Sequence, residues 1–139
     1  MQIRLAARTT GATASNAVYS RFNADSGSNY NAHFLLGNGS SVSSGTTGTT
    51  TYGLSGIVSA SGAGANEFGA GVLDLLDFSS TSKNATLRTL AGTTSNNRID
   101  LHSALWIDTS AITSWELLPE LGNFVAGTRF SLYGIKAGA

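Results

Sequence analysis

The chain has 139 residues, which suits a single domain, and its 8 basic and 8 acidic residues give a formal net charge of zero. Charged residues make up 12% of the sequence, about half the usual share of roughly 25%, and the Lys and Arg residues form no cluster, which argues against nucleic-acid binding. There are no cysteines, so a disulfide framework and a thiolate zinc site are excluded.

Most of the polarity comes from Ser, Thr, Asn and Gly, and an uncharged surface of this kind favours association with other proteins. The first residues, MQIRLAARTTG, lack the apolar run of a signal peptide. No segment approaches the roughly 20 consecutive apolar residues of a membrane span. We therefore expect a protein that is made in a cytoplasm without a signal peptide and that does not insert into a membrane.

The first half of the chain contains three alternating runs and one low-complexity segment. Residues 2–8 alternate between apolar and polar, which predicts a strand with one buried face. Residues 18–23 and 30–37 also alternate, and the turn residues of ADSGSN join them, which predicts a hairpin. Residues 37–51 contain mainly Gly, Ser and Thr, which predicts a long flexible loop.

Residues 52–59 predict another strand, whereas the run FGAGVLDLLDF at 68–78 is ambiguous between a strand and a short helix. Gly69 and Gly71 oppose the helix, because each would cost about 1 kcal/mol relative to Ala. We therefore favour a strand for this segment.

The remaining strands are expected at 83–91, 98–108, 112–118 and 128–136. In the last of these, Phe130 and Leu132 face one way, and Arg129, Ser131, Tyr133 and Ile135 face the other. Eight or nine antiparallel strands in one domain spanning 1–139 predict an all-β, two-sheet β-sandwich that is jelly-roll-like.

Three segments carry a resemblance: RFNADSGSNY (21–30), SALWIDTSAITSWELLP (103–119) and GNFVAGTRFSLYGIKA (122–137). They resemble a family of small jelly-roll structural proteins of tailed-bacteriophage virions, of the tail-fibre, minor structural or capsid-decoration type. The matching motifs cover about a third of the chain, but their order and spacing extend the similarity over nearly all of it. None of the motifs carries chemistry, so the resemblance implies a fold and a setting and does not imply a reaction.

No catalytic, cofactor or metal site is predicted. His33 and His102 are the only histidines, and each is expected to make ordinary strand contacts, because a metal site would need further converging ligands. Glycoside hydrolysis needs two carboxylates about 5 to 9.5 Å apart, and no local pair among the eight carboxylates meets that condition. There is also no G-x-S-x-G motif for a serine hydrolase.

Four aromatic residues are candidates for contacts with a partner or a ligand: Tyr30, Tyr52, Trp106 and Trp115. Their rings are able to stack on sugars, but packing in the core or in an interface is the commoner role of Trp and Tyr. Trp106 lies on a central alternating strand and is expected in the core. Tyr52, beside the low-complexity segment, is expected to be the most exposed.

The leading hypothesis is a non-enzymatic structural protein of a phage virion, most simply a capsid decoration or cement protein. Its expected partners are further copies of itself, in a homotrimer or another closed homo-oligomer, and other virion proteins such as a major capsid protein or tail adaptor. The alternative is a tail-fibre tip that recognises a host surface glycan or protein, because one fold serves both roles. A glycan-degrading enzyme is the remote alternative.

Overall fold

The computed structural model describes residues 1–136, which form ten strands and one short 3-10 helix, η1 (Thr94–Asn96). These residues contain no helix long and apolar enough to cross a bilayer. The predicted two-sheet β-sandwich is confirmed, with ten strands in place of eight or nine. The strands are β1 (Gln2–Ala7), β2 (Ser15–Phe22), β3 (Tyr30–Gly37), β4 (Val42–Thr50), β5 (Gly53–Ser59), β6 (Gly69–Leu75), β7 (Ala85–Thr93), β8 (Arg98–Trp106), β9 (Trp115–Pro119) and β10 (Arg129–Tyr133).

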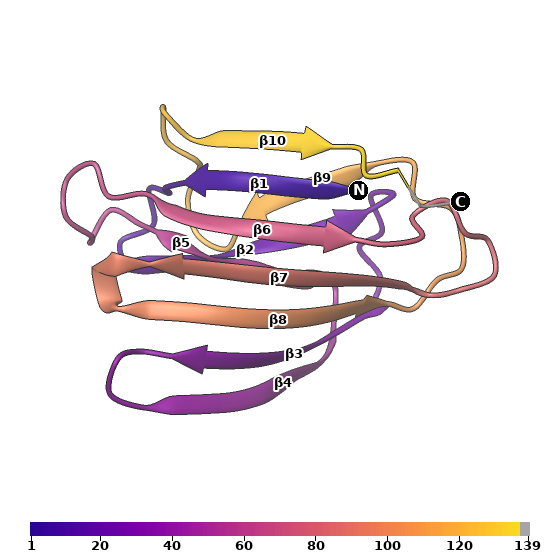
Figure 1. Ribbon diagram of the computed structural model, residues 1–139, viewed down its shortest axis with the longest axis horizontal. Coiled ribbons are helices and arrows are strands. Elements are labelled where there is room, and N and C mark those ends of the chain that lie inside the picture. Colours follow the sequence, from indigo (N-terminus) through magenta and orange to yellow (C-terminus); the bar gives the residue numbers. More distant parts are fainter. Residues whose placement is uncertain (137–139) are drawn as a thin grey trace.

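The two sheets differ in width (Figure 1). One sheet has seven strands in the order β10-β1-β6-β7-β8-β3-β4, and the other has three in the order β5-β2-β9. The first strand pairs with the last, and β2 pairs with β9, so strands from the two ends of the chain lie together in both sheets. Because three strands do not cover seven, the outer strands of the wide sheet extend beyond the narrow one.

The core lies between the sheets and is built by the alternation of strand side chains. On β1 the side chains of Ile3, Leu5 and Ala7 are buried, as the alternating run predicts. The 68–78 segment forms β6, and its Leu73 and Leu75 join the same core. An aromatic group fills one end of the core, where Phe22, Tyr30 and Trp106 pack with ring centroids 5.6 to 6.5 Å apart.

The predicted hairpin between 18–23 and 30–37 is wrong. Both segments are strands, but β2 belongs to the three-stranded sheet and β3 to the seven-stranded sheet. Asn23 and Ala24 take positive φ angles of 51° and 55° at the end of β2, and the chain crosses there to the other layer. The Phe22 N–H then donates to the Tyr30 hydroxyl over 2.9 Å, which ties the two layers together at this crossing.

The predicted flexible loop over 37–51 is also wrong for residues 42–50, which form β4 and pair with β3. Backbone pairing does not require apolar side chains, so a Ser/Thr/Gly segment is able to form an edge strand. The Thr47 hydroxyl accepts from the Ala32 N–H over 3.0 Å. Gly45 lies directly under the Phe34 ring, where an added Cβ atom would come within 2.7 Å of the ring.

Candidate functional site

The outer face of the seven-stranded sheet carries its apolar side chains in the open. In the first half of β8 the usual arrangement is inverted: Ile99 and Leu101 are 57% and 50% exposed, whereas Asp100 and His102 are 1% and 2% exposed. A strand with one buried face normally turns its apolar side inward. Two large aliphatic side chains are therefore held in solvent while two polar side chains lie between the sheets.

The strand register gathers more aliphatic side chains around Ile99 and Leu101. Val72, Leu90, Leu101 and Leu35 are cross-strand neighbours on β6, β7, β8 and β3, and they form a row about 14 Å long at the usual strand spacing. Ile99 lies in the next row, which ends at Val42 on the edge strand β4. We call this surface the outer apolar face, defined by Leu35, Val42, Val72, Leu90, Ile99 and Leu101.

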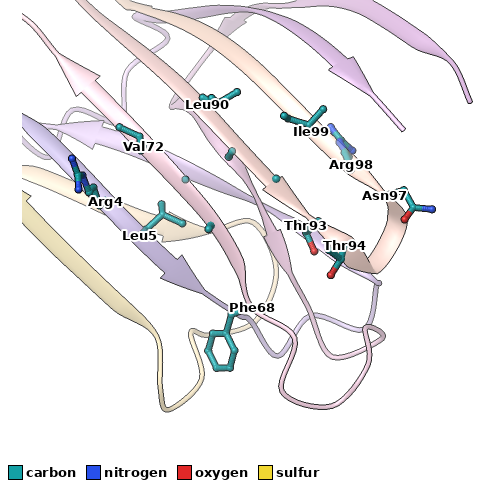
Figure 2. Close-up of a pocket in the computed structure, with 14 residues that line it drawn as sticks. Arg4, Leu5, Phe68, Val72, Leu90, Thr93, Thr94, Asn97, Arg98 and Ile99 are labelled. Atoms are coloured by element: carbon teal, nitrogen blue, oxygen red, sulfur yellow. The ribbon is translucent and has the colours of Figure 1, made fainter. Parts of the chain in front are cut away.

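A shallow trough of about 790 Å³ continues the row of Ile99 across β7 and β6, beside the row that contains Val72 and Leu90 (Figure 2). Its floor contains Ala70 and Gly92, which are paired across β6 and β7, so no side chain fills the space. Val72 and Leu90 lie along one side, and Phe68 lies on the other. Such a trough admits a protruding side chain or a small ligand.

The charges around this face are mainly positive. Arg4, Arg88 and Arg129 are exposed on strands of the seven-stranded sheet, on the outward-facing positions. The Arg4 guanidinium lies over the Tyr133 ring, 5.2 Å from its centroid. Asp74 is the acidic residue in the same rows, and it accepts from the Gln2 amide over 2.9 Å. The face thus combines an apolar centre with a weakly basic margin.

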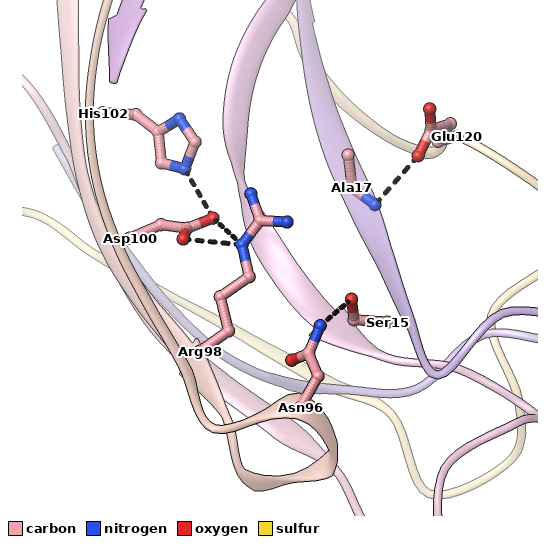
Figure 3. A network of polar contacts seen from close by, with 7 residues as sticks. All are labelled: Ser15, Ala17, Asn96, Arg98, Asp100, His102 and Glu120. Atoms are coloured by element: carbon pink, nitrogen blue, oxygen red, sulfur yellow. Dashed lines mark hydrogen bonds and ion pairs between the residues drawn. The ribbon is translucent and has the colours of Figure 1, made fainter. Parts of the chain in front are cut away.

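Directly beneath the face, Asp100 is held by two neighbours from its own strand (Figure 3). The Arg98 Nε lies 2.8 and 3.0 Å from the two carboxylate oxygens, and the His102 Nε2 lies 3.2 Å from one of them. Burial by itself raises the pKa of Asp100, but the hydrogen bonds from His102 and Arg98 outweigh it and hold the pKa below its ordinary value. The carboxylate is therefore charged, paired and closed to substrate, which fits a structural role.

Of the four candidate contact residues, Tyr30 and Trp106 are buried in the core at 0% and 1% exposure. Burial of Trp106 agrees with its expected place on a central strand. Its indole N–H donates to Asp25 over 2.8 Å, which satisfies the one polar atom of the ring.

The other two predicted residues, Trp115 and Tyr52, are partly buried. The Trp115 indole N–H donates to the Ser20 hydroxyl over 2.7 Å. Tyr52 stacks on Tyr19 with ring centroids 3.7 Å apart and is less exposed than Tyr133, so the expectation that it is the most exposed aromatic is wrong. Both lie apart from the outer apolar face, and a role for either in binding stays a prediction.

The two histidines lie in different surroundings. His33 is exposed on β3, while His102 is buried. Within residues 1–136, no group of three or more His, Asp or Glu side chains is arranged to hold a metal ion. The exposed Asp77 pairs with Lys83 over 2.6 Å, and Asp25 accepts hydrogen bonds from Trp106 and Asn29.

The outer apolar face was not predicted from the sequence. A usable signal was present in RIDLHSALW, where apolar residues occupy both alternating sets of positions. One set, with Ala104 and Trp106, enters the core, so the other set, with Ile99 and Leu101, has to lie outside. Reading both sets would have predicted an apolar outer surface on this strand.

Comparison with known proteins identifies no relative. The chain matches no protein-family model, no curated protein and no solved structure.

Proposed function

We propose that this chain is a structural protein of a bacteriophage virion, of the capsid decoration or cement type, and that it docks on another virion protein through the outer apolar face. The observation that carries the proposal is the inverted half of β8, where Ile99 and Leu101 face solvent while Asp100 and His102 are buried. Contiguous apolar patches of several hundred Å² are uncommon on monomers and mark interaction sites. The resemblance of segments 21–30, 103–119 and 122–137 to virion structural proteins supports the setting.

The size of the face supports a contact with a large, complementary surface. Five of its side chains are about half exposed or more, and fully burying one such side chain is worth about 1.5–3 kcal/mol. Burying the exposed half of all five would contribute about 5 kcal/mol. Because association costs about 4–15 kcal/mol in lost freedom, the partner has to add apolar surface of its own. A complementary apolar patch on the particle surface would meet that requirement.

The test introduces charge at the centre of the outer apolar face. The Leu90→Asp/Leu101→Asp double variant should bind at least tenfold more weakly to particles of the encoding phage assembled without this protein, as measured by co-sedimentation. Two carboxylates would have to be desolvated at the contact, and about 1.4 kcal/mol already corresponds to a tenfold loss. Both side chains point away from the core, so the far-ultraviolet circular dichroism spectrum should stay that of a β protein.

The matched control is Leu121→Asp, which makes the same change at a residue that is about half exposed outside this face. It should leave particle binding unchanged. Equal binding by the double variant and the wild type would rule out the outer apolar face as the docking surface. Failure of the wild type to bind any part of the particle would rule out the structural role itself.

A second candidate function is recognition of a host surface glycan, as in a tail-fibre tip. The trough favours it, because its volume of about 790 Å³ suits an oligosaccharide and because Phe68, Thr94 and Asn97 line it with a ring and polar groups. Binding on a glycan array that disappears in Phe68→Ala would support this alternative. A silent array combined with particle binding would support the decoration role.

A further inference from the structure

The strand β10 forms one margin of the seven-stranded sheet, with β1 on one side and no strand on the other. All five of its side chains, Arg129 to Tyr133, are exposed. Figure 1 shows β10 along the outer edge of the molecule, with the loop that precedes it projecting beyond the start of the strand. Within the described residues, no hydrogen bond other than those to β1 is made by the β10 backbone. A free margin of this kind is able to pair with a further strand.

The three-stranded sheet does not cover the inward-facing side chains of β10, because the strand extends beyond that sheet. Phe130 packs edge-on against Phe124, with ring centroids 5.0 Å apart. Leu132 pairs with Ile3 and Phe130 with Leu5, so both belong to the core-facing side. They are nevertheless 64% and 40% exposed. Beside Leu132 lies a half-open apolar pocket of about 250 Å³, lined also by Ile3, Phe78, Ile112 and Trp115. Ile3 and Leu5 themselves stay buried, so this margin exposes the two β10 side chains and the pocket beside Leu132.

The opposite margin of the same sheet is different. There β4 has the sequence VSSGTTGTT, with a single large apolar side chain. The Thr47 hydroxyl accepts from the Ala32 N–H, and the Thr50 hydroxyl donates to the Tyr30 carbonyl. In the narrow sheet, the edge strand β9 ends in Pro119 and carries Glu116, both of which discourage pairing. Among these three margins, β10 combines free backbone with uncovered apolar side chains.

We propose that β10 pairs antiparallel with β10 of a second copy, across a two-fold axis that runs perpendicular to the sheet and passes midway between the two Ser131 residues. This register uses all five residues of the strand. On the core-facing side, Phe130 of each copy lies opposite Leu132 of the other. The two uncovered side chains then cover each other beside both apolar pockets, and the two seven-stranded sheets become one continuous sheet.

The charges fit this register. On the outer side, Arg129 of one copy lies opposite Tyr133 of the second copy, so the cation meets an aromatic ring and the two arginines stay apart. The same pairing of side chains is already present within the chain, where the Arg4 guanidinium lies over Tyr133. Ser131 faces Ser131 at the axis, where no charge is buried. The contact is isologous and closes as a dimer.

The pairing itself does not depend on the proposed function. One consequence does: the two outer apolar faces would lie side by side in one sheet and would bind a particle with two contacts in place of one.

The absence of cysteine from the chain allows a direct test. In the Ser131→Cys variant, the two thiols would lie opposite each other with Cβ atoms about 4.5–5.5 Å apart, close to disulfide geometry. Mild oxidation should convert most of the protein to a covalent dimer on a non-reducing gel. The matched control is Ser44→Cys, an exposed serine on the opposite edge strand β4, which should cross-link at least tenfold more slowly.

Sedimentation velocity on the cysteine-free wild type provides a second measurement. A concentration-dependent dimer is expected, and Leu132→Asp should raise its dissociation constant at least tenfold, because the new carboxylate would lie against Phe130 of the second copy. A wild type that stays monomeric up to about 1 mM, equal cross-linking of the two cysteine variants, or a dimer that is indifferent to Leu132→Asp would each overturn the proposal. Loss of particle binding without loss of the dimer would overturn only the proposed function.

Discussion

At the scale of single residues, the carboxylate of Asp25 fixes the turn between the two sheets. It accepts from the Trp106 indole N–H over 2.8 Å, from the Asn29 amide over 2.9 Å and from the Gly27 N–H over 2.8 Å. The hydrogen bond from Trp106, followed by that from Asn29, lowers the pKa of Asp25 below its ordinary value of 3.8. One short side chain thus holds a core tryptophan and the exposed turn in place.

The pH dependence of this contribution follows from the direction of the pKa shift. Because the pKa is lower in the folded protein, the stabilisation is fully present above about pH 4 and is lost as the pH falls through the folded pKa. We expect Asp25→Ala to lower the free energy of unfolding by about 1–3 kcal/mol at pH 7. Urea unfolding should show a clearly smaller difference from the wild type at about pH 2.

Asp25→Asn is the companion variant, since it keeps an oxygen acceptor and removes the charge. It should lie between Asp25→Ala and the wild type at pH 7. A difference between wild type and Asp25→Ala that is the same at both pH values would show that the charge of Asp25 contributes nothing to stability.

At the scale of secondary-structure elements, a strand could be predicted from the sequence wherever one of its two faces is buried in the core. β1, β3 and β6 each combine alternating apolar side chains with turn residues at their ends, so their sequence pattern reflects the burial directly. Their partners could not be predicted in the same way. The positive φ angles of Asn23 and Ala24 send the chain to the other sheet, and the local alternation of the two strands is the same whichever sheet each strand joins.

The candidate site could not be predicted as a surface for a related reason. Leu90 and Leu101 come from consecutive strands, but Leu35 comes from β3, which is far from them in the sequence, and only the register brings the three into one row. Each residue alone looks like an ordinary member of an alternating strand. The inversion at Ile99 and Asp100 depends on which face of β8 the narrow sheet covers.

β4 offers a test at this scale, because a strand and a flexible loop differ in hydrogen exchange. Amides of Val42–Thr50 that donate to β3 should exchange at least roughly a hundredfold more slowly than an unstructured peptide, while the alternate amides face solvent and exchange quickly. Nuclear magnetic resonance at single-residue resolution would measure this pattern. The Ser79 and Thr81 amides in the exposed turn serve as the fast-exchanging reference, because the neighbouring Ser80 and Ser82 amides donate hydrogen bonds. Uniformly fast exchange across 42–50 would contradict the strand.

At the scale of the whole molecule, long-range pairing dominates the fold. β1 pairs with β10, and β2 pairs with β9, so neither pair is able to form until both ends of the chain come together. Proteins held mainly by such non-local contacts fold slowly, in about milliseconds to seconds, and small domains usually unfold in one step. The single core cluster draws side chains from both sheets, which favours one cooperative unit.

We therefore expect tryptophan fluorescence, which reports on Trp106 and Trp115, and far-ultraviolet circular dichroism to give coincident urea-unfolding curves. Stopped-flow refolding should show a main phase in the range of about 1 millisecond to 10 seconds. Separate transitions for the two probes would show that the sheets unfold independently.

The pairing of β1 with β10 also makes a circular permutation of the chain feasible. Gln2 and Tyr133 face each other in the ladder, so their Cα atoms are only about 4.5–5.5 Å apart. A bridge of a few glycines is enough to join these positions covalently, and new ends then belong in the exposed turn around Thr81. The order of strands along the chain is thus separable from the architecture that those strands build.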